Sequence, residues 1–243
     1  MRPIKRGLSP IAGDFKKYSD AANDLHTRIG AYCSYCERKI EFLLAVEHIQ
    51  AKGIPKYAHL ECRWNNFLFG CVNCNSTKKD KDVALADVLL PDRDNTFYAY
   101  VYHQDGTITV STLISPAAQI CAANTLALVG LDKSEKIQRD TNLTAVARGR
   151  VAQRKSAWDV AQESADDLRN TPSDTLRSVI IKLALATGFF SVWMKVFEHD
   201  IDMRVRLIRA FNGSEESECF HAITTAPVFP APNPDALPHG GKA

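Results

Sequence analysis

This chain of 243 residues has no hydrophobic run long enough to cross a membrane. A spanning helix needs about 20 consecutive apolar residues. The longest candidate, Val179–Val196, is interrupted by two lysines and a glycine. No apolar stretch follows the first segment, Met1–Arg6, so it does not resemble a secretory signal peptide. We therefore expect a cytoplasmic protein with no membrane partner.

The sequence also lacks a strong overall charge. Its 30 Lys and Arg residues and 28 Asp and Glu residues give a net charge of +2. Residues 1–82 hold 14 basic against 9 acidic residues, whereas the remainder holds 16 against 19. A modestly basic first third suits contact with phosphate, but a field this weak does not establish a nucleic-acid partner.

Cysteine is present in an odd number, seven, and four of these form two C-x-x-C pairs. The pairs are Cys33-Ser34-Tyr35-Cys36 and Cys71-Val72-Asn73-Cys74. Two thiolates in one such turn can face one ion, so two turns predict a closed, structural zinc site with four cysteine ligands. Disulfides or a redox dithiol are the alternatives, and a reducing compartment favours the metal. The other three cysteines are expected to be ordinary free thiols: Cys62, Cys121 and Cys219.

Hydrophobic spacing and turn residues divide the chain into elements. A hairpin is predicted over Thr96–Thr112, because two strand-like runs flank the turn dipeptide Asp105-Gly106. Helices are predicted where apolar residues recur at helical spacing between capping residues. These are Tyr18–Ile29, Asn75–Asp82, Pro116–Val129, Ser134–Leu168, Asp174–Thr187 and one or two helices over Phe189–Phe211. From Ile223 onward the chain is rich in Pro, Ala and Gly and is expected to be disordered.

Between and beside the cysteine pairs lie residues that suit metal-assisted hydrolysis. Glu47-His48 joins a carboxylate to a side chain that can take a proton from water near neutral pH. Asn75 directly follows Cys74. Carboxylate and amide oxygens suit a hard cation such as Mg²⁺. Each piece alone has a plainer interpretation, since Glu47-His48 could be a surface feature and Asn75 a helix N-cap.

The order of these pieces resembles the HNH endonuclease family in its zinc-braced form. That pattern has a cysteine pair, an acidic residue followed by His, an Asn five residues before the next Cys, and C-x-x-C followed by His or Asn. The corresponding residues are Cys33 and Cys36, Glu47-His48, Asn66, Cys71 and Cys74, and Asn75, within residues 32–82. Asn65 precedes Asn66, but the five-residue spacing favours Asn66. The departure is Asn75 in place of the family's final His.

The resemblance implies an α+β fold and a division of labour. A ββα-metal core, formed by a hairpin and a helix starting near Asn75, would be followed by the predicted hairpin and a mostly helical region. His48 would be the general base, and Asn66 would brace the loop and orient it. Glu47 and Asn75 would bind Mg²⁺ or Mn²⁺, which makes Asn75 part of the catalytic set. We expect a nuclease domain over 1–95, a partner-binding region over 96–222 and a tail over 223–243.

Basic residues crowd the same segment and are candidates for contact with the nucleic-acid backbone. The ones we name as nucleic-acid-binding are Lys52, Arg63, Lys78 and Lys79. Solvated surface lysines are the alternative. A second cluster lies on the long predicted helix and could contact nucleic acid or an acidic partner: Arg148, Arg150, Arg154 and Lys155.

One branch of the family is especially similar, namely PtuB, the nuclease subunit of Septu-type anti-phage systems, including those linked to retrons. The likeness rests on Met1–Ile4, Tyr32–Glu37, Ala45–His48 and Trp64–Leu68. It implies a PtuA-like ABC-class ATPase as partner and a role in bacterial defence. The alternative is a non-catalytic zinc module that binds nucleic acid or another protein. The joint presence of Glu47-His48, Asn66 and Asn75 favours the nuclease, because a binding module has no need of them.

Overall fold

The computed structural model describes residues 1–40, 45–133 and 141–243, which form an α+β fold with two small antiparallel sheets. None of the helices in these ranges combines the length and hydropathy that a bilayer crossing requires. The elements in chain order are η1 (Tyr18–Ala21), α1 (Ala22–Ile29), β1 (Ala45–His48), η2 (Pro55–Leu60), η3 (Trp64–Asn66), β2 (Phe67–Gly70), α2 (Val72–Lys78), η4 (Leu85–Asp87), β3 (Tyr100–Tyr102), β4 (Ile108–Val110), α3 (Pro116–Val129), α4 (Thr141–Asn170), α5 (Asp174–Thr187), α6 (Phe190–Val196) and α7 (Ile201–Ala210).

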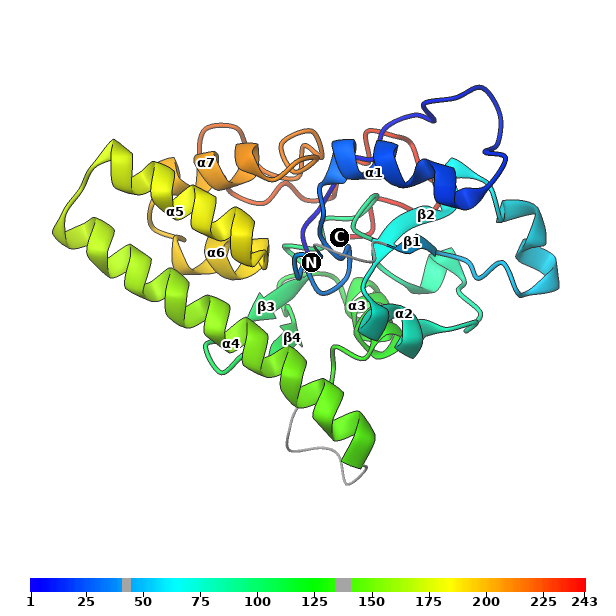
Figure 1. The fold of residues 1–243 in the computed structure, drawn as a ribbon, viewed down its shortest axis with the longest axis horizontal. Helices are drawn as coiled ribbons and strands as arrows, with labels where there is room; N and C mark the ends of the chain where they lie inside the picture. Colours follow the sequence, from blue (N-terminus) through cyan, green and yellow to red (C-terminus); the bar gives the residue numbers. More distant parts are fainter. Residues whose placement is uncertain (41–44, 134–140) are drawn as a thin grey trace.

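Strands β1 and β2 form an antiparallel hairpin that leads directly into α2 (Figure 1). His48 pairs with Phe67 in this hairpin, so Glu47 and His48 stand at the end of β1 where the long connection to β2 begins. The predicted start of the helix near Asn75 was wrong, because α2 begins at Val72. The reason is a sulfur cap: the Cys71 Sγ accepts a hydrogen bond from the Cys74 N–H. Asn75 therefore lies inside the helix and is not its N-cap.

The predicted hairpin around Asp105-Gly106 is confirmed. Its strands, β3 and β4, are shorter than the strand-like runs predicted within Thr96–Thr112. The predicted bounds of α3 and α5 are also confirmed. Helix α3 ends because Gly130 adopts the left-handed conformation at φ 70°, and α5 begins because the Ser173 side chain caps the Leu176 N–H. The helix predicted from Ser134 is present from Thr141 to Asn170, and its expected first turns at 134–140 lie outside the described residues.

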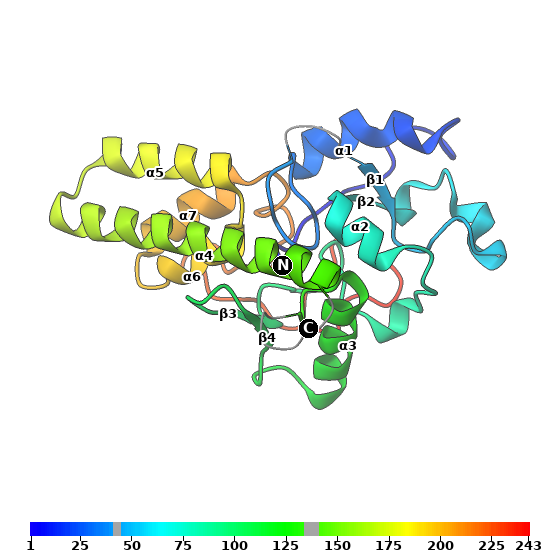
Figure 2. The same cartoon turned by 60° about the horizontal axis from the view of Figure 1, so that its bottom comes forward.

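Helices α4–α7 enclose an apolar core of their own, whereas the two hairpins, α1 and α3 surround another. Figures 1 and 2 show α5, α6 and α7 at one end of the molecule and α1, β1, β2 and α2 at the other. The long helix α4 packs against α5 and α6 and extends from them toward α3 in each view. Three buried aromatic residues on and beside α6 fill the helical core, namely Phe190, Trp193 and Phe197, whereas the buried Phe189 belongs to the other core.

The segment 223–243 differs from the expectation of disorder, because it follows a defined path across the molecule. Ala243 is fully buried, and its carbonyl accepts hydrogen bonds from the N–H groups of Asn95 and Ala231. The Lys242 N–H donates to the buried carboxylate of Asp94 at 2.9 Å. Composition does not reveal such an arrangement, since it rests on a few polar side chains far away in the sequence.

Candidate functional site

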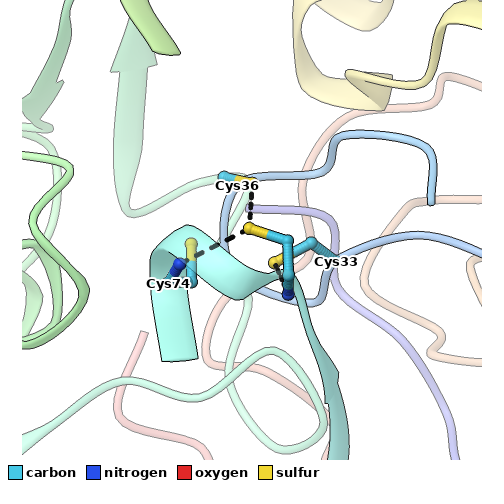
Figure 3. A group of neighbouring side chains, drawn as sticks. Cys33, Cys36 and Cys74 are labelled. Atoms are coloured by element: carbon cyan, nitrogen blue, oxygen red, sulfur yellow. Dashed lines mark hydrogen bonds between the residues drawn. The ribbon is translucent and has the colours of Figure 1, made fainter. Parts of the chain in front are cut away.

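The four cysteines of the two C-x-x-C pairs lie together, and all four are buried. Their sulfur atoms fall within 4.8 Å of one another, and the Cys36 and Cys71 Sγ atoms are 3.6 Å apart. Four thiolates around a zinc ion at ~2.3 Å stand about 3.8 Å from each other. Figure 3 shows the labelled cysteines Cys33, Cys36 and Cys74 gathered around the first turn of α2. The donor set therefore fits one zinc ion.

Local backbone geometry prepares the thiols for a metal. The Cys71 N–H donates to the Cys33 Sγ at 3.3 Å, and the Cys74 N–H donates to the Cys71 Sγ at 3.4 Å. Hydrogen bonds from neighbouring thiols lower the pKa of Cys71, while burial raises the pKa of Cys33. All four thiols are free, and 3.6 Å is far beyond the ~2.05 Å of a disulfide bond. The metal interpretation is favoured over a disulfide.

The first cysteine turn is attached to strand β2. The Ser34 N–H donates to the Phe69 carbonyl at 2.9 Å, and the Phe69 N–H donates to the Ser34 Oγ at 3.2 Å. Because β2 also pairs with β1, the cysteine cluster fixes the hairpin that carries Glu47 and His48.

A cleft of about 530 Å³ opens where η1, the end of β1 and α2 meet. Glu47, His48 and Asn75 all line it, so the structure brings these three predicted residues to one surface. Among the described residues, the Asn75 side chain has no hydrogen-bond partner, which leaves its amide oxygen free for a ligand. The other polar side chains that line the cleft are Tyr18, Ser19, Lys52, Lys78, Lys79 and Asp80.

His48 is held in one tautomer by the backbone. Its Nε2 lies 2.8 Å from the Glu61 carbonyl oxygen, which can only accept, so Nε2 donates and Nδ1 keeps the lone pair of the neutral ring. The ring packs edge-on against Tyr18 and Phe67, at centroid distances of 4.9 and 5.4 Å. Burial lowers the pKa of His48 and favours this neutral form.

Asn66 is buried and does not line the cleft. It holds the loop between β1 and β2, which carries the Glu61 carbonyl that orients His48. Its Oδ1 accepts from the Gln50 N–H at 2.8 Å, and its Nδ2 donates to the carbonyls of Gln50 at 2.9 Å and Leu60 at 3.3 Å. Leu60 immediately precedes Glu61, whose carbonyl fixes His48. Asn66 thus ties together the two ends of the loop.

Glu47 is buried and faces an ammonium group rather than solvent. Its Oε1 lies 2.9 Å from the Lys78 Nζ, and both side chains are nearly inaccessible, at 3% and 1% exposure. Burial raises the pKa of Glu47, and the Lys78 ammonium opposes that shift. Lys78 lines the cleft but is 1% exposed, and this burial argues against its predicted contact with nucleic acid. If Lys78 turned outward to a phosphate, the buried Glu47 carboxylate would lose its charged partner.

The other predicted basic contacts divide into two groups. Lys79 and Lys52 line the cleft, although Lys52 also pairs with the Glu61 carboxylate at 2.7 Å. Arg63 is exposed, pairs with Asp14 at 3.2 Å and does not line the cleft.

Two arginines of the second predicted basic cluster are structural. Arg150 is buried and donates to the carbonyls of Val129 and Gly130 at the end of α3. Arg154 is buried and donates to the Gly106 carbonyl in the β3–β4 turn. Neither is available to an acidic partner or to nucleic acid. Arg148 and Lys155 remain exposed on α4.

Sequence reasoning missed Tyr18 and named Lys78 without predicting its buried orientation. Tyr18 reaches the cleft from η1, and nothing in its local pattern distinguishes it from a core aromatic residue. The inward orientation of Lys78 had a signal, since it follows Cys74 by four residues and shares its face of α2.

Comparison with known proteins assigns no family to this chain. None of the protein-family models matches it, and a search of curated proteins finds no matching relative. The functional argument therefore rests on the residues and their geometry.

Proposed function

We propose that this protein is a metal-dependent HNH-type endonuclease that hydrolyses phosphodiester bonds, with a zinc ion bound by Cys33, Cys36, Cys71 and Cys74. The observation that carries the proposal is the meeting of Glu47, His48 and Asn75 on one cleft, with Asn75 directly following Cys74 of the cysteine cluster on α2. A non-catalytic zinc module gives no reason for a free carboxamide and a neutral imidazole at the same opening.

The two metals have different parts in this proposal. A zinc ion with four thiolate ligands has no open position, so it serves to fix the hairpin and α2. The Glu47 carboxylate and the Asn75 amide oxygen are the groups that would hold Mg²⁺ or Mn²⁺, which accept few protein ligands and retain waters. That divalent ion, when bound, neutralises charge on the phosphate and the departing oxygen.

The protein's own side chains supply the rest of the chemistry. His48, neutral and protonated at Nε2, accepts a proton from the attacking water at Nδ1. The Glu61 carbonyl stabilises the resulting imidazolium, because it keeps its hydrogen bond to Nε2–H. Asn66 maintains the position of that carbonyl through Leu60. Lys52 and Lys79 supply positive charge at the cleft for the nucleic-acid backbone.

The resemblance to PtuB extends the proposal to anti-phage defence with a PtuA-like ABC-class ATPase. The candidate partner-binding region is then the exposed surface of α4–α7. The aromatic residues of α6 are buried in the core and are not part of that surface. Co-purification of the full chain with an ATPase encoded beside it tests this extension. Recovery of the chain alone under those conditions would count against it.

One observation favours the non-catalytic alternative, namely the existing ion pair between Glu47 and Lys78. Cleavage of plasmid DNA and total RNA with Mg²⁺ or Mn²⁺, with and without a chelator, separates the two functions. We expect His48→Ala to lower the cleavage rate by roughly 10²–10⁴-fold, the usual contribution of a general base. His59→Ala, at an exposed histidine outside the cleft, is the matched control. Cleavage by His48→Ala at the wild-type rate would contradict the assignment.

A further inference from the structure

Lys78 is buried where α2 meets β1. A lysine side chain is rarely buried in a protein unless its ammonium group is paired. Its Nζ lies 2.9 Å from the Glu47 Oε1 and donates to the His48 carbonyl at 2.7 Å. Both partners come from the last two residues of β1. A buried charge is costly unless it is paired and hydrogen-bonded, and Lys78 meets both conditions here.

The neighbouring lysine behaves differently, although it lines the same cleft. Lys79 is exposed and has no side-chain partner among the described residues. It is free to approach a phosphate, whereas Lys78 is 1% exposed and fully engaged. The two lysines, adjacent in sequence, therefore have separate roles.

Glu47 is confined on its other side by strand β2. A Cβ atom added at Gly70 would come within 3.1 Å of the Glu47 Cβ and 3.3 Å of its Cγ. The absence of a side chain at Gly70 thus provides the room that the Glu47 side chain occupies. Lys78 holds the carboxylate and Gly70 accommodates its stem, so two separate substitutions can disturb its position.

We propose that Lys78 is a positioning residue of the candidate active site. By holding the Oε1 of Glu47 and the carbonyl of His48, it fixes the end of β1, so that Glu47 presents Oε2 to the divalent ion and His48 presents its imidazole to water. It does not touch the substrate. This inference rests on the proposed nuclease function, and it assigns the buried charge pair a role in metal binding rather than in stability alone.

Kinetics of the full-length protein separate positioning from substrate contact. We expect Lys78→Met to lower turnover at saturating nucleic acid by roughly 10–100-fold, the usual effect of losing a partner that orients a metal ligand. The Kd for nucleic acid, measured with chelator present, is expected to stay at the wild-type value, because Lys78 is buried. Lys79→Met should weaken that Kd, and Lys182→Met, at an exposed lysine on α5, is the control. Weaker binding with intact turnover in Lys78→Met would overturn the inference.

Binding of Mn²⁺ alone, followed by electron paramagnetic resonance, tests the inference without requiring cleavage. Removing a nearby positive charge should by itself tighten cation binding. Lost positioning should instead weaken Mn²⁺ binding by about 10–100-fold in Lys78→Met. Unchanged or tighter binding would refute the role of Lys78. If the wild-type chain binds Mn²⁺ but cleaves no nucleic acid, the proposed function is refuted. The comparison of Mn²⁺ affinity between the wild-type chain and Lys78→Met still tests the role of Lys78.

A second variant covers the case in which Lys78→Met fails to fold, judged by zinc content and thermal melting. Gly70→Ala keeps the ammonium group but displaces Glu47 from the opposite side. The same loss of Mn²⁺ affinity and turnover is expected. Wild-type values in a folded Gly70→Ala protein would overturn the claim that the position of Glu47 matters, and a wild-type chain that binds no Mn²⁺ would end both proposals.

Discussion

Asn66 makes more hydrogen bonds to the loop between β1 and β2 than any side chain that faces the cleft. Its three bonds join Gln50, at one end of the loop, to Leu60, near the other. An unpaired, buried polar group costs about 1–3 kcal/mol. The loop conformation, and with it the Glu61 carbonyl that holds His48, therefore depends on one amide side chain.

Replacing Asn66 by Ala should lower both stability and cleavage. We expect a loss of roughly 1–3 kcal/mol, because buried backbone groups lose their partners. That corresponds to a fall of about 2–12 °C in melting temperature for a chain of this size. Thermal melting and cleavage rate measure the two effects. Asn65→Ala, at the exposed neighbour, is the matched control, and equal losses in both variants would contradict the choice of Asn66.

Spacing along the sequence located Asn66, Glu47 and His48 but could not reveal what each side chain contacts. Lys78 and Arg150 look like ordinary surface charges in the sequence. Their partners are a carboxylate 31 residues away in one case and carbonyls at the end of another helix in the other. Neighbouring residues in the sequence do not identify partners this distant, so the contacts of both side chains could not be predicted.

Among the elements, the first turn of α2 depends on the cysteine cluster. The Cys71 sulfur caps the helix, and the Cys74 sulfur lies one turn later. We expect the wild-type protein to contain one zinc ion per chain and Cys74→Ser to lose it, because three thiolates and an alcohol bind zinc more weakly than four thiolates. Elemental analysis and thermal melting should both register the loss.

Cys121→Ser is the control for that measurement, since Cys121 lies on α3 outside the cluster. Zinc content should remain at the wild-type value in this variant. Full zinc content in Cys74→Ser, or its loss in Cys121→Ser, would show that the four clustered thiols are not the zinc ligands.

Element boundaries were predictable where the signals are local. Gly130 and the capping serine before α5 act within a few residues of the helix ends they define. The start of α2 was not predictable from capping preferences, because cysteine is not among the common N-cap residues. Its sulfur caps this helix in a setting that the distant Cys33 helps to create.

At the scale of the whole molecule, Glu37 joins the four-cysteine segment to the helical half. Its carboxylate accepts from the Ser191 N–H at 2.7 Å, the Ser191 hydroxyl at 2.6 Å and the Tyr102 hydroxyl at 3.0 Å. The Met1 ammonium lies 3.2 Å away. The residue next to Cys36 thus contacts α6, β3 and the first residue of the chain. No pattern in the sequence predicts these contacts of Glu37, because the residues that meet there lie up to 154 positions apart.

Glu37→Gln should weaken the coupling between the two halves. Breaking a buried ion pair costs about 3–5 kcal/mol, and the amide cannot accept from all these donors at once. We expect amide hydrogen exchange to accelerate in α6 and in the turn of Cys33 and Cys36 together. Glu163→Gln, at an exposed site on α4, is the control. Faster exchange in α6 alone would mean that the four-cysteine segment is stable by itself. Joint acceleration would mean that the helical half stabilises the proposed active site. A partner bound to those helices would then change the stability of the cleft by way of Glu37.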